Sequence, residues 1–462
     1  MTLPATFVSD LEQVVGAASV RQDEAARTTY GQDGLKAPRL PDVVVMPGTT
    51  TEVAAVAEMC DRSRVPLYVR GGGTGYSGGA VPVRGGVLLS MERFNRILEI
   101  DERNLLVVTE PNVVTARLQA AVEQVGLFYP PDPASLEESA IGGNIAECAG
   151  GPRAFKYGTT RRYVLGLEVV LPTGEVIRTG SKAVKSVVGY DLTQLLVGSE
   201  GTLGIITQAV LRLVPKPPAR ATLRATFDSI EAAAGAVDEL IRARVVPATL
   251  ELVDGECLAA VRQYLGGEEL APAGTAGLLI LEVDGLAHEV AAEAGLVEQA
   301  CRAAGATEVL RAADDAEREA IWRVRRELSP ALKTIASLKL NQDVVVPRGR
   351  VPDLFRLIAD LAREFGLRIP SFGHAGDGNI HVNIMVDASD AAAVERARRA
   401  QRLLFEGVVA REGSISGEHG IGYTKLPFIS LELSPEVIAL SKRIKQAFDP
   451  HAILNPGKVF PE

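Results

Sequence analysis

The chain has 462 residues, of which 47% are hydrophobic, so it holds enough apolar material for two or three packed domains and shows no compositional sign of disorder. Its net charge of −9 offers no basic surface for nucleic acid. No apolar run approaches the roughly 18–20 residues that span a bilayer, and the start lacks the pattern of a signal peptide. The four cysteines are spaced too widely to indicate a disulfide framework or an iron–sulfur cluster. These features predict a cytoplasmic protein without a transmembrane segment.

The first predicted elements are a helix and a strand that lead into a glycine-rich loop. The helix carries an apolar stripe that includes Val53 and Cys60, and a short strand follows at residues 67–70. The loop at residues 71–79 holds six glycines, whose backbone N–H groups can converge on a phosphate. It matches the G-x-G-x-x-G dinucleotide fingerprint only superficially, because that motif needs a helix directly after its glycines and Pro82 prevents one here. The loop therefore predicts a phosphate cradle of another kind.

Two further glycine-rich segments follow, at residues 130–151 and 197–206. Between them, residues 163–171 and 175–179 predict a β-hairpin around a Pro-Thr-Gly turn. Each cluster alone is compatible with ordinary turns. Together, three clusters indicate a ligand long enough to touch several loops.

Residues 380–386 alternate and predict a strand with Ile380 and Val382 in a core, while His381 and Asn383 share the opposite face. His374 precedes this strand, and the dipeptide Glu418-His419 follows later in a second glycine-rich loop. Two imidazoles and one carboxylate form a recurrent ligand set for zinc-like ions that leaves a coordination position open. The alternative is a set of structural histidines in glycine-rich loops.

The sequence resembles the FAD-binding fold of the vanillyl-alcohol-oxidase type, also called the PCMH type. Within it, the chain is similar to the branch that contains glycolate oxidase FAD subunits, D-lactate dehydrogenases and D-2-hydroxyglutarate dehydrogenases. The resemblance covers nearly the whole chain and rests on six motifs in this order: VRGGGTGYSGG, IGGNIAECAGGPRAFKYG, GSEGTLGIIT, FGHAGDGNIHVN, SGEHGIG and LNPGK.

The resemblance implies an FAD site built largely from glycines. Asn455 is expected to approach the isoalloxazine ring, whereas no contact is carried over to Cys148, where relatives often have Asn. Because residues 71–79 contain no histidine, FAD should be bound non-covalently. The other expected FAD contacts are Gly71, Gly72, Gly73, Thr74, Gly75, Ser77, Gly78, Gly79, Pro131, Gly142, Gly143, Gly150, Gly151, Gly201 and Ile206.

The resemblance also implies a catalytic set. Residues matching His374, His381 and Glu418 bind a divalent metal, usually zinc, and the residue matching His419 serves as the base. A metal on the substrate hydroxyl and carboxylate would lower the pKa of the alcohol while a hydride leaves for flavin N5. The expected reaction is oxidation of a D-2-hydroxyacid, D-lactate or glycolate, to the 2-oxoacid. The alternatives are a D-2-hydroxyglutarate dehydrogenase, a redox-silent FAD enzyme such as an alkyl-glycerone-phosphate synthase, and a non-catalytic flavin subunit.

The substrate carboxylate needs a cation, and a planar guanidinium suits it well. The predicted helix at residues 316–333 carries four arginines, and the branch's Trp-x-x-Arg pattern selects Arg325. An ordinary charged helix face is the alternative, and it suits the other three arginines. Asn383 and Lys339 are further expected substrate contacts.

The expected fold class is α+β. Residues 1–217 should form a two-subdomain FAD-binding domain, and residues 218–425 an α+β substrate domain with an antiparallel sheet. Residues 426–462 should return to the flavin. Because this chain lacks cluster-binding cysteines, electrons should pass to an iron–sulfur or electron-transfer-flavoprotein subunit, a quinone or a soluble carrier. The protein could associate peripherally with a membrane through such a partner. A homodimer is a further expectation.

Overall fold

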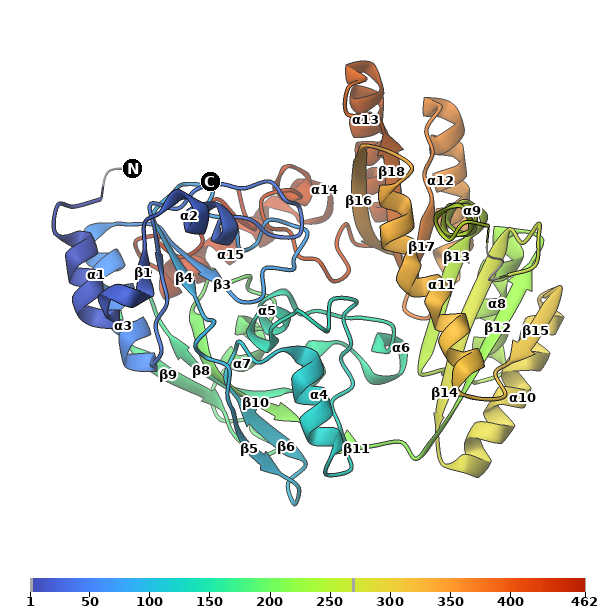
Figure 1. Ribbon diagram of the computed structural model, residues 1–462, viewed down its shortest axis with the longest axis horizontal. Coiled ribbons are helices and arrows are strands. Elements are labelled where there is room, and N and C mark those ends of the chain that lie inside the picture. Colours follow the sequence, from blue (N-terminus) through green and yellow to red (C-terminus); the bar gives the residue numbers. More distant parts are fainter. Residues whose placement is uncertain (1–2, 268–270, 462) are drawn as a thin grey trace. The chain divides into compact units, whose positions relative to one another are not determined.

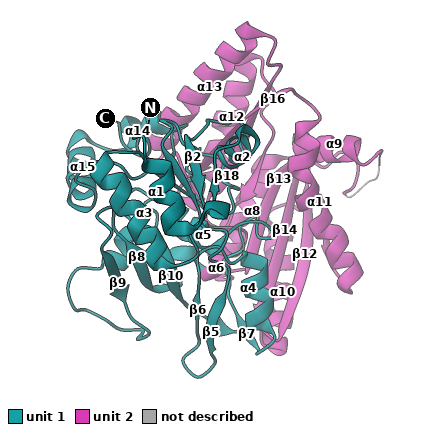
Figure 2. Ribbon diagram, turned by 60° about the vertical axis from the view of Figure 1, so that its left-hand side comes forward, with its two compact units in different colours: residues 1–150, 158–216, 418–462 teal, residues 151–157, 217–417 magenta. Residues whose placement is uncertain are grey.

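The computed structural model describes residues 3–267 and 271–461 (Figure 1). The chain divides into two compact units, coloured separately in Figure 2. Unit 1 comprises residues 1–150, 158–216 and 418–462, and unit 2 comprises residues 151–157 and 217–417. Residues 1–2, 268–270 and 462, which fall within the three predicted domain ranges, lie outside the described residues. The observed units differ from the predicted domain ranges, because residues 151–157 belong to unit 2 and residues 418–425 belong to unit 1.

Unit 1 contains short strands and mostly short helices. Its helices are α1 (Phe7–Val15), α2 (Glu24–Tyr30), α3 (Thr50–Ser63), α4 (Thr115–Glu123), α5 (Ile141–Glu147), α7 (Leu192–Leu196), α14 (Ile429–Glu432) and α15 (Pro435–Phe448), with 3-10 turns η1 (Ala17–Ser19), η2 (Thr160–Arg162) and η4 (Leu426–Phe428). Its strands are β1 (Val20–Arg21), β2 (Val43–Val45), β3 (Leu67–Arg70), β4 (Val87–Ser90), β5 (Ile97–Asp101), β6 (Leu106–Thr109), β7 (Leu127–Phe128), β8 (Val164–Val170), β9 (Val176–Gly180), β10 (Ile205–Arg212) and β11 (Val214–Pro215).

These strands form two main sheets. The first has the order β1-β2-β4-β3, with β2, β4 and β3 parallel, and the second is antiparallel in the order β5-β6-β10-β8-β9. Helix α3 begins where Thr49 accepts a hydrogen bond from Glu52 N, and it buries its predicted apolar stripe against the first sheet. Near the C-terminus, Leu454 pairs in parallel with Leu67 of β3, so the final segment belongs to the same core.

Unit 2 is built from longer elements. Its helices are α6 (Ala154–Tyr157), α8 (Ile230–Arg242), α9 (Gly255–Tyr264), α10 (Ala287–Ala303), α11 (Asp315–Lys333), α12 (Val351–Phe365) and α13 (Ala391–Val409), with the 3-10 turn η3 (Arg348–Arg350). Its strands are β12 (Ala219–Phe227), β13 (Thr249–Asp254), β14 (Gly277–Gly285), β15 (Glu308–Arg311), β16 (Leu338–Val345), β17 (Ser371–His374) and β18 (Asn379–Val386).

All seven strands join one antiparallel sheet in the order β15-β12-β14-β13-β17-β18-β16. On one face, Leu278 and Ile280 of β14 pack with Val324 of α11 and Cys257 of α9. On the other face, α8 and α10 contact β12 and β14, and α13 contacts β16 and β18 (Figure 1). Helices α9 and α11 thus cover part of the first face, and α8, α10 and α13 contact the opposite face.

The structure confirms the expected α+β class with antiparallel sheets. The predicted strand at residues 67–70 is β3, the predicted hairpin is β8–β9, and the predicted strand at residues 380–386 is β18. No helix in residues 3–267 and 271–461 combines the length and the apolar character needed to cross a membrane.

Candidate functional site

The three glycine-rich segments of unit 1 line one pocket. Ten of the residues expected to contact FAD are in its wall: Gly71, Gly72, Gly73, Thr74, Gly75, Gly79, Gly142, Gly143, Gly201 and Ile206. The wall also contains Asp33, Asn144, Glu147 and Glu200, which were not predicted. Segments distant in sequence thus form a single cavity, as expected for one elongated ligand.

Three side chains from outside the glycine loop fix its backbone. Asp33 Oδ2 accepts a hydrogen bond from Gly78 N at 2.8 Å, and Asn455 Nδ2 donates to Gly79 O at 2.9 Å. Lys458 Nζ donates to the carbonyl oxygens of Gly78 at 2.6 Å and Val81 at 2.7 Å. The LNPGK motif therefore braces the loop, and the contacts shown for the Asn455 amide are with backbone and with Lys458.

The cavity fits a phosphate-bearing cofactor. Gly143 lines it, yet an added Cβ there would meet no protein atom within 4 Å, so the protein's own packing does not require a glycine. Ser77 Oγ is buried and has no hydrogen-bond partner among the described residues, although Ser77 lies outside the pocket wall. The open glycine wall is the feature that a bound phosphate group would explain.

The remaining expected FAD residues lie outside this wall. Gly78 has φ +81°, and a Cβ there would stand 2.1 Å from a ring carbon of Tyr423, so this position requires glycine for packing. Pro131 O accepts a hydrogen bond from Gln119 at 2.9 Å. A Cβ on Gly150 would lie 2.8 Å from the carboxylate of Glu418, and Gly151 belongs to unit 2.

The loop with Glu418 and His419 is anchored to a wall residue of the cavity. The buried Glu200 carboxylate accepts hydrogen bonds from Ile421 N and Gly422 N, both at 2.7 Å. Burial raises the pKa of Glu200, and these two amides act in the opposite direction. The His419 ring centroid lies 5.6 Å from that of Tyr76 in the first glycine loop. Glu200 therefore places the expected base of unit 1 beside the cavity.

Unit 2 carries its polar residues on one face of its sheet. The register pairs Glu251 with His374, and Asp343 with His381. Cross-strand partners point to the same face of a sheet, so side chains from β13, β16, β17 and β18 meet there. His381 is 6% exposed and Asn383 is fully buried, so the polar face of the predicted strand lies in the interior.

The Glu251 carboxylate contacts one imidazole and one guanidinium, and a second imidazole lies beside the first. His374 Nδ1 contacts Glu251 Oε1, and Arg325 Nε donates to Glu251 Oε2 at 2.5 Å. The ring centroids of His374 and His381 are 5.3 Å apart. Burial raises the pKa of Glu251, but the charges of His374 and Arg325 and their hydrogen bonds outweigh it and hold that pKa well below its usual range.

Part of the Arg325 guanidinium has no hydrogen-bond partner among the described residues. Its guanidinium carbon stands 4.7 Å from the centroid of the Phe372 ring. Its Nη2 is buried and makes no hydrogen bond within the described part of the chain. A buried charged donor without a partner is costly, and a ligand carboxylate would satisfy it.

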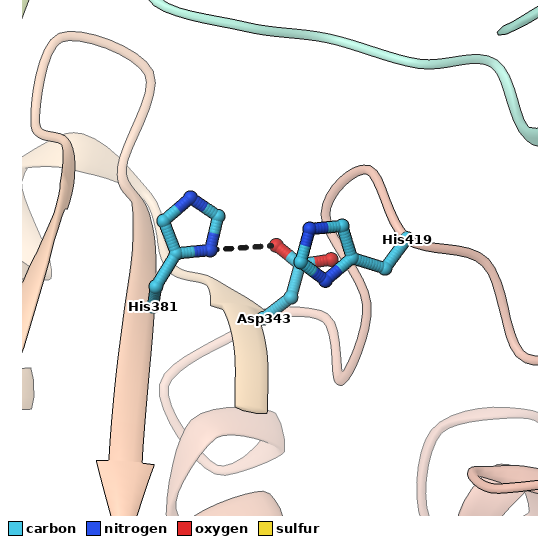
Figure 3. A group of neighbouring side chains, drawn as sticks. All are labelled: Asp343, His381 and His419. Carbon is cyan, nitrogen blue, oxygen red and sulfur yellow. Dashed lines mark ion pairs between the residues drawn. The ribbon is translucent and has the colours of Figure 1, made fainter. Parts of the chain in front are cut away.

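Asp343 is the second buried carboxylate of this face. His381 Nδ1 lies 3.9 Å from Asp343 Oδ1 (Figure 3). Asn379 Nδ2 donates to the same oxygen at 2.6 Å, and Gly417 N donates to Oδ2 at 2.9 Å. Two adjacent imidazoles with a carboxylate beside one of them fit a zinc-like ion, since such carboxylates orient ligating histidines.

The other two expected substrate residues lie further along the same face. Asn383 Nδ2 donates to Pro370 O at 3.1 Å and to His381 O at 3.0 Å, and its Oδ1 accepts from Asn341 at 2.7 Å. Lys339 pairs with Met385 across the strands, and burial lowers the pKa of its ammonium. The shown contacts of Asn383 are therefore structural, whereas Lys339 is a half-buried cation.

Five acidic residues of the two sites were not predicted: Asp33, Glu147, Glu200, Glu251 and Asp343. Glu251 has a sequence signal, because it is a charged residue flanked by leucines in its strand. Asp343 has a weaker one, because its strand also holds Lys339, Asn341 and Gln342. An unpaired charge rarely occupies a buried strand, so such a position indicates a partner. Asp33 has no comparable signal.

Comparisons with known proteins identify the family of the chain. Residues 41–180 match the family model for the FAD binding domain, and residues 216–459 match that for the C-terminal domain of FAD linked oxidases. The chain is 42% identical over 451 residues to glycolate oxidase subunit GlcD of Bacillus subtilis, covering 97% of this chain and 96% of that protein. It is 36% identical over 430 residues to the D-lactate dehydrogenase of Anaerostipes hadrus, covering 91% and 89%.

The solved structure of p-cresol methylhydroxylase with bound substrate superposes with a TM-score of 0.80 at 18% identity, covering 98% of this chain and 96% of that one. This likeness confirms the PCMH-type fold. With the matches to both family models and to full-length relatives, it leads to one conclusion: the chain belongs to the FAD-linked oxidases and is an FAD-dependent oxidoreductase.

Proposed function

We propose that the protein is an FAD-dependent dehydrogenase that oxidises a D-2-hydroxyacid, D-lactate or glycolate, to the corresponding 2-oxoacid. The observation that carries the proposal is the buried polar face of unit 2, where Arg325 presents an unsatisfied Nη2 near two neighbouring imidazoles. A 2-hydroxyacid has the matching groups, a carboxylate and an adjacent hydroxyl. The names of the two relatives described above support the same substrate class.

Each residue has a distinct role in this proposal. Arg325 binds the substrate carboxylate through Nη2, with Lys339 as a further contact. Asn383 donates to Pro370 O and His381 O and so orients the strand beside them. His374, His381 and Glu418 would hold a divalent metal, with zinc the best match to the donor set. When bound, such an ion would stabilise negative charge on the substrate oxygen, and FAD would supply the electron acceptor. His419 takes the hydroxyl proton, a contribution of about two to four orders of magnitude in rate for a well-placed base.

FAD should be held without a covalent bond, through backbone amides of the glycine loops. Residues 71–79 contain no histidine or cysteine that could attach the flavin. The purified protein should therefore be yellow and should release all of its flavin on acid precipitation. Flavin that stays in the protein pellet would contradict non-covalent binding.

Reduced FAD must pass its electrons on. The cysteines are free and scattered, with Cys60, Cys257 and Cys301 buried in separate places, so this chain offers no cluster site. An iron–sulfur or electron-transfer-flavoprotein partner is proposed as the acceptor, in keeping with the Bacillus subtilis relative being named a subunit. We also propose that the protein forms a homodimer and is cytoplasmic. It would associate with a membrane only through such a partner.

A substrate panel with an artificial dye acceptor tests the function. The panel should contain D-lactate, L-lactate, glycolate and D-2-hydroxyglutarate, with chelator-treated enzyme as a parallel arm. We expect turnover with D-lactate or glycolate and loss of turnover after metal removal. Turnover of D-2-hydroxyglutarate alone would transfer the assignment to that dehydrogenase. No turnover on any of the four acids would instead favour a redox-silent FAD enzyme or a non-catalytic flavin subunit.

A further inference from the structure

The Glu251 carboxylate joins two side chains that the proposed function uses for different purposes. Its Oε1 contacts Nδ1 of His374, and its Oε2 accepts from Nε of Arg325. Glu251 is completely buried, and its strand register places it directly across from His374. A rigid strand position therefore presents one carboxylate oxygen to each partner.

The contact with His374 decides which ring nitrogen can bind a metal. Oε2 of Glu251 pairs with the guanidinium of Arg325, and a carboxylate paired with a cation only accepts hydrogen bonds. Nδ1 of His374 must therefore carry a proton, which assigns the lone pair of the neutral ring to Nε2. Carboxylates in this arrangement also raise the basicity of a ligating imidazole.

The hydrogen bond to Glu251 orients the guanidinium of Arg325. Nε is used by Glu251, and the Phe372 ring stands 4.7 Å from the guanidinium carbon. These two contacts fix the plane of the group, while Nη2 makes no hydrogen bond to any described residue. The donor for a ligand carboxylate is thus oriented before a ligand arrives.

We propose that Glu251 is a positioning residue that sets the metal-binding nitrogen of His374 and the carboxylate-binding edge of Arg325 together. This inference rests on the proposed function, because it assigns Glu251 no role apart from that metal and that substrate. It predicts that one substitution, remote from the flavin, weakens metal binding and substrate binding at the same time.

Glu251→Gln tests this prediction because the amide keeps the shape but has only one acceptor oxygen. If that oxygen faces Arg325, the NH2 group faces Nδ1 of His374. It then favours the His374 tautomer that carries its proton on Nε2, and a protonated Nε2 cannot bind a metal. If the oxygen faces His374, the NH2 group opposes Nε of Arg325 and displaces the guanidinium. In both orientations the negative charge that favours the metal and the guanidinium is lost.

Glu282 provides a matched control on the neighbouring strand β14. It is 6% exposed, and its Oε2 accepts hydrogen bonds from Thr222 Oγ1 at 2.8 Å and Trp322 Nε1 at 3.4 Å. The register pairs Glu282 with Thr249, two residues before Glu251, so both carboxylates lie on the same face. Glu282→Gln therefore reproduces the loss of a buried charge on this face, without touching His374 or Arg325.

The experiment measures zinc affinity of the metal-free, FAD-loaded protein by competition with a chromophoric chelator, and KM and kcat at saturating zinc. For Glu251→Gln we expect zinc affinity to fall by about 10–100-fold and KM to rise by roughly tenfold, with unchanged FAD content. Glu282→Gln should match the wild type in both. Equal zinc affinity and KM in the wild type and Glu251→Gln would overturn the inference, as would equal losses in the two variants.

If Glu251→Gln does not fold, Glu251→Asp decides the question. The shorter side chain keeps the charge but cannot reach both partners from the same strand position. Weaker zinc binding with a raised KM would support the inference, and wild-type values for both would overturn it. A wild-type protein that binds no zinc and oxidises no 2-hydroxyacid would refute the proposed function instead, so the two failures are distinguishable.

Discussion

The two candidate sites are built from different materials. The cofactor pocket of unit 1 is formed by loop backbone, and its glycines leave room for a ligand. The polar face of unit 2 is formed by side chains on adjacent strands, where buried carboxylates orient histidines and an arginine. Backbone suits a cofactor that is held throughout turnover. Side chains on a sheet suit a small substrate, whose charges must be matched at defined points.

This comparison predicts separable phenotypes. Substitutions in the glycine loops should change FAD binding and leave metal binding intact, and substitutions on the sheet face should do the reverse. Glu418 and His419 are the exceptions, because they belong to unit 1 and yet are proposed to bind the metal and to accept the substrate proton.

The largest effect is expected for His419→Ala. The proton transfer that His419 performs occurs only in the transition state, so kcat should fall by about 10²–10⁴ with little change in KM. The acidic limb of the pH–rate profile should also disappear, because a protonated imidazole cannot accept a proton. Steady-state kinetics across pH, with FAD content measured in parallel, provide the test. An unaltered kcat and pH profile would remove His419 as the base.

A smaller effect, confined to the flavin, is expected for Gly143→Leu. The added side chain meets open space in the protein but occupies the cofactor pocket, so FAD affinity should fall roughly 100-fold while the fold is retained. Gly235→Leu is the control, because Gly235 is another helical glycine with open space at its Cβ, but it lies in unit 2. Flavin titration and zinc titration of both variants test the separation. Normal FAD affinity in Gly143→Leu would place the cofactor elsewhere.

The third effect, whose lower limit is the smallest of the three, is a rise in KM expected for Arg325→Ala. A charge-assisted hydrogen bond contributes about 1.5–3 kcal/mol, so KM should rise roughly 10–150-fold, with a lesser change in kcat. Arg326→Ala is the matched control, since Arg326 is the next residue on the same helix and its exposed side chain pairs with Glu319. Comparable KM values for the two variants would return Arg325 to an ordinary charged helix face.

The sequence predicted the pocket of unit 1 more fully than the face of unit 2. Glycine loops are local motifs, so short stretches of sequence marked the segments that hold Gly72, Gly143 and Gly201, and the family resemblance assigned these residues to FAD. Glu251 lies 123 residues before its partner His374, and only the strand order β13-β17-β18 makes them neighbours. No strand was predicted at residues 338–345, and no local pattern shows that Asp343 lies beside His381.

Asn455 illustrates a different difficulty. The closing LNPGK motif marked it as important, yet its amide donates to Gly79 O and Glu200 O, so its shown contribution is to hold two of the glycine segments together. A motif identifies a residue without stating whether it contacts the ligand or the loop around the ligand. The same applies to Lys458, which binds the carbonyl oxygens of the first loop.

The most direct test of the central claim is an anaerobic flavin reduction experiment on the wild type and on His381→Ala. D-Lactate or glycolate is added without any electron acceptor, and the flavin absorbance, bound FAD and bound zinc are measured. The account predicts that the wild-type flavin bleaches, and that His381→Ala keeps its FAD, lacks zinc and stays oxidised. Bleaching of His381→Ala at the wild-type rate, or a wild-type flavin that stays oxidised with every 2-hydroxyacid of the panel, would contradict it.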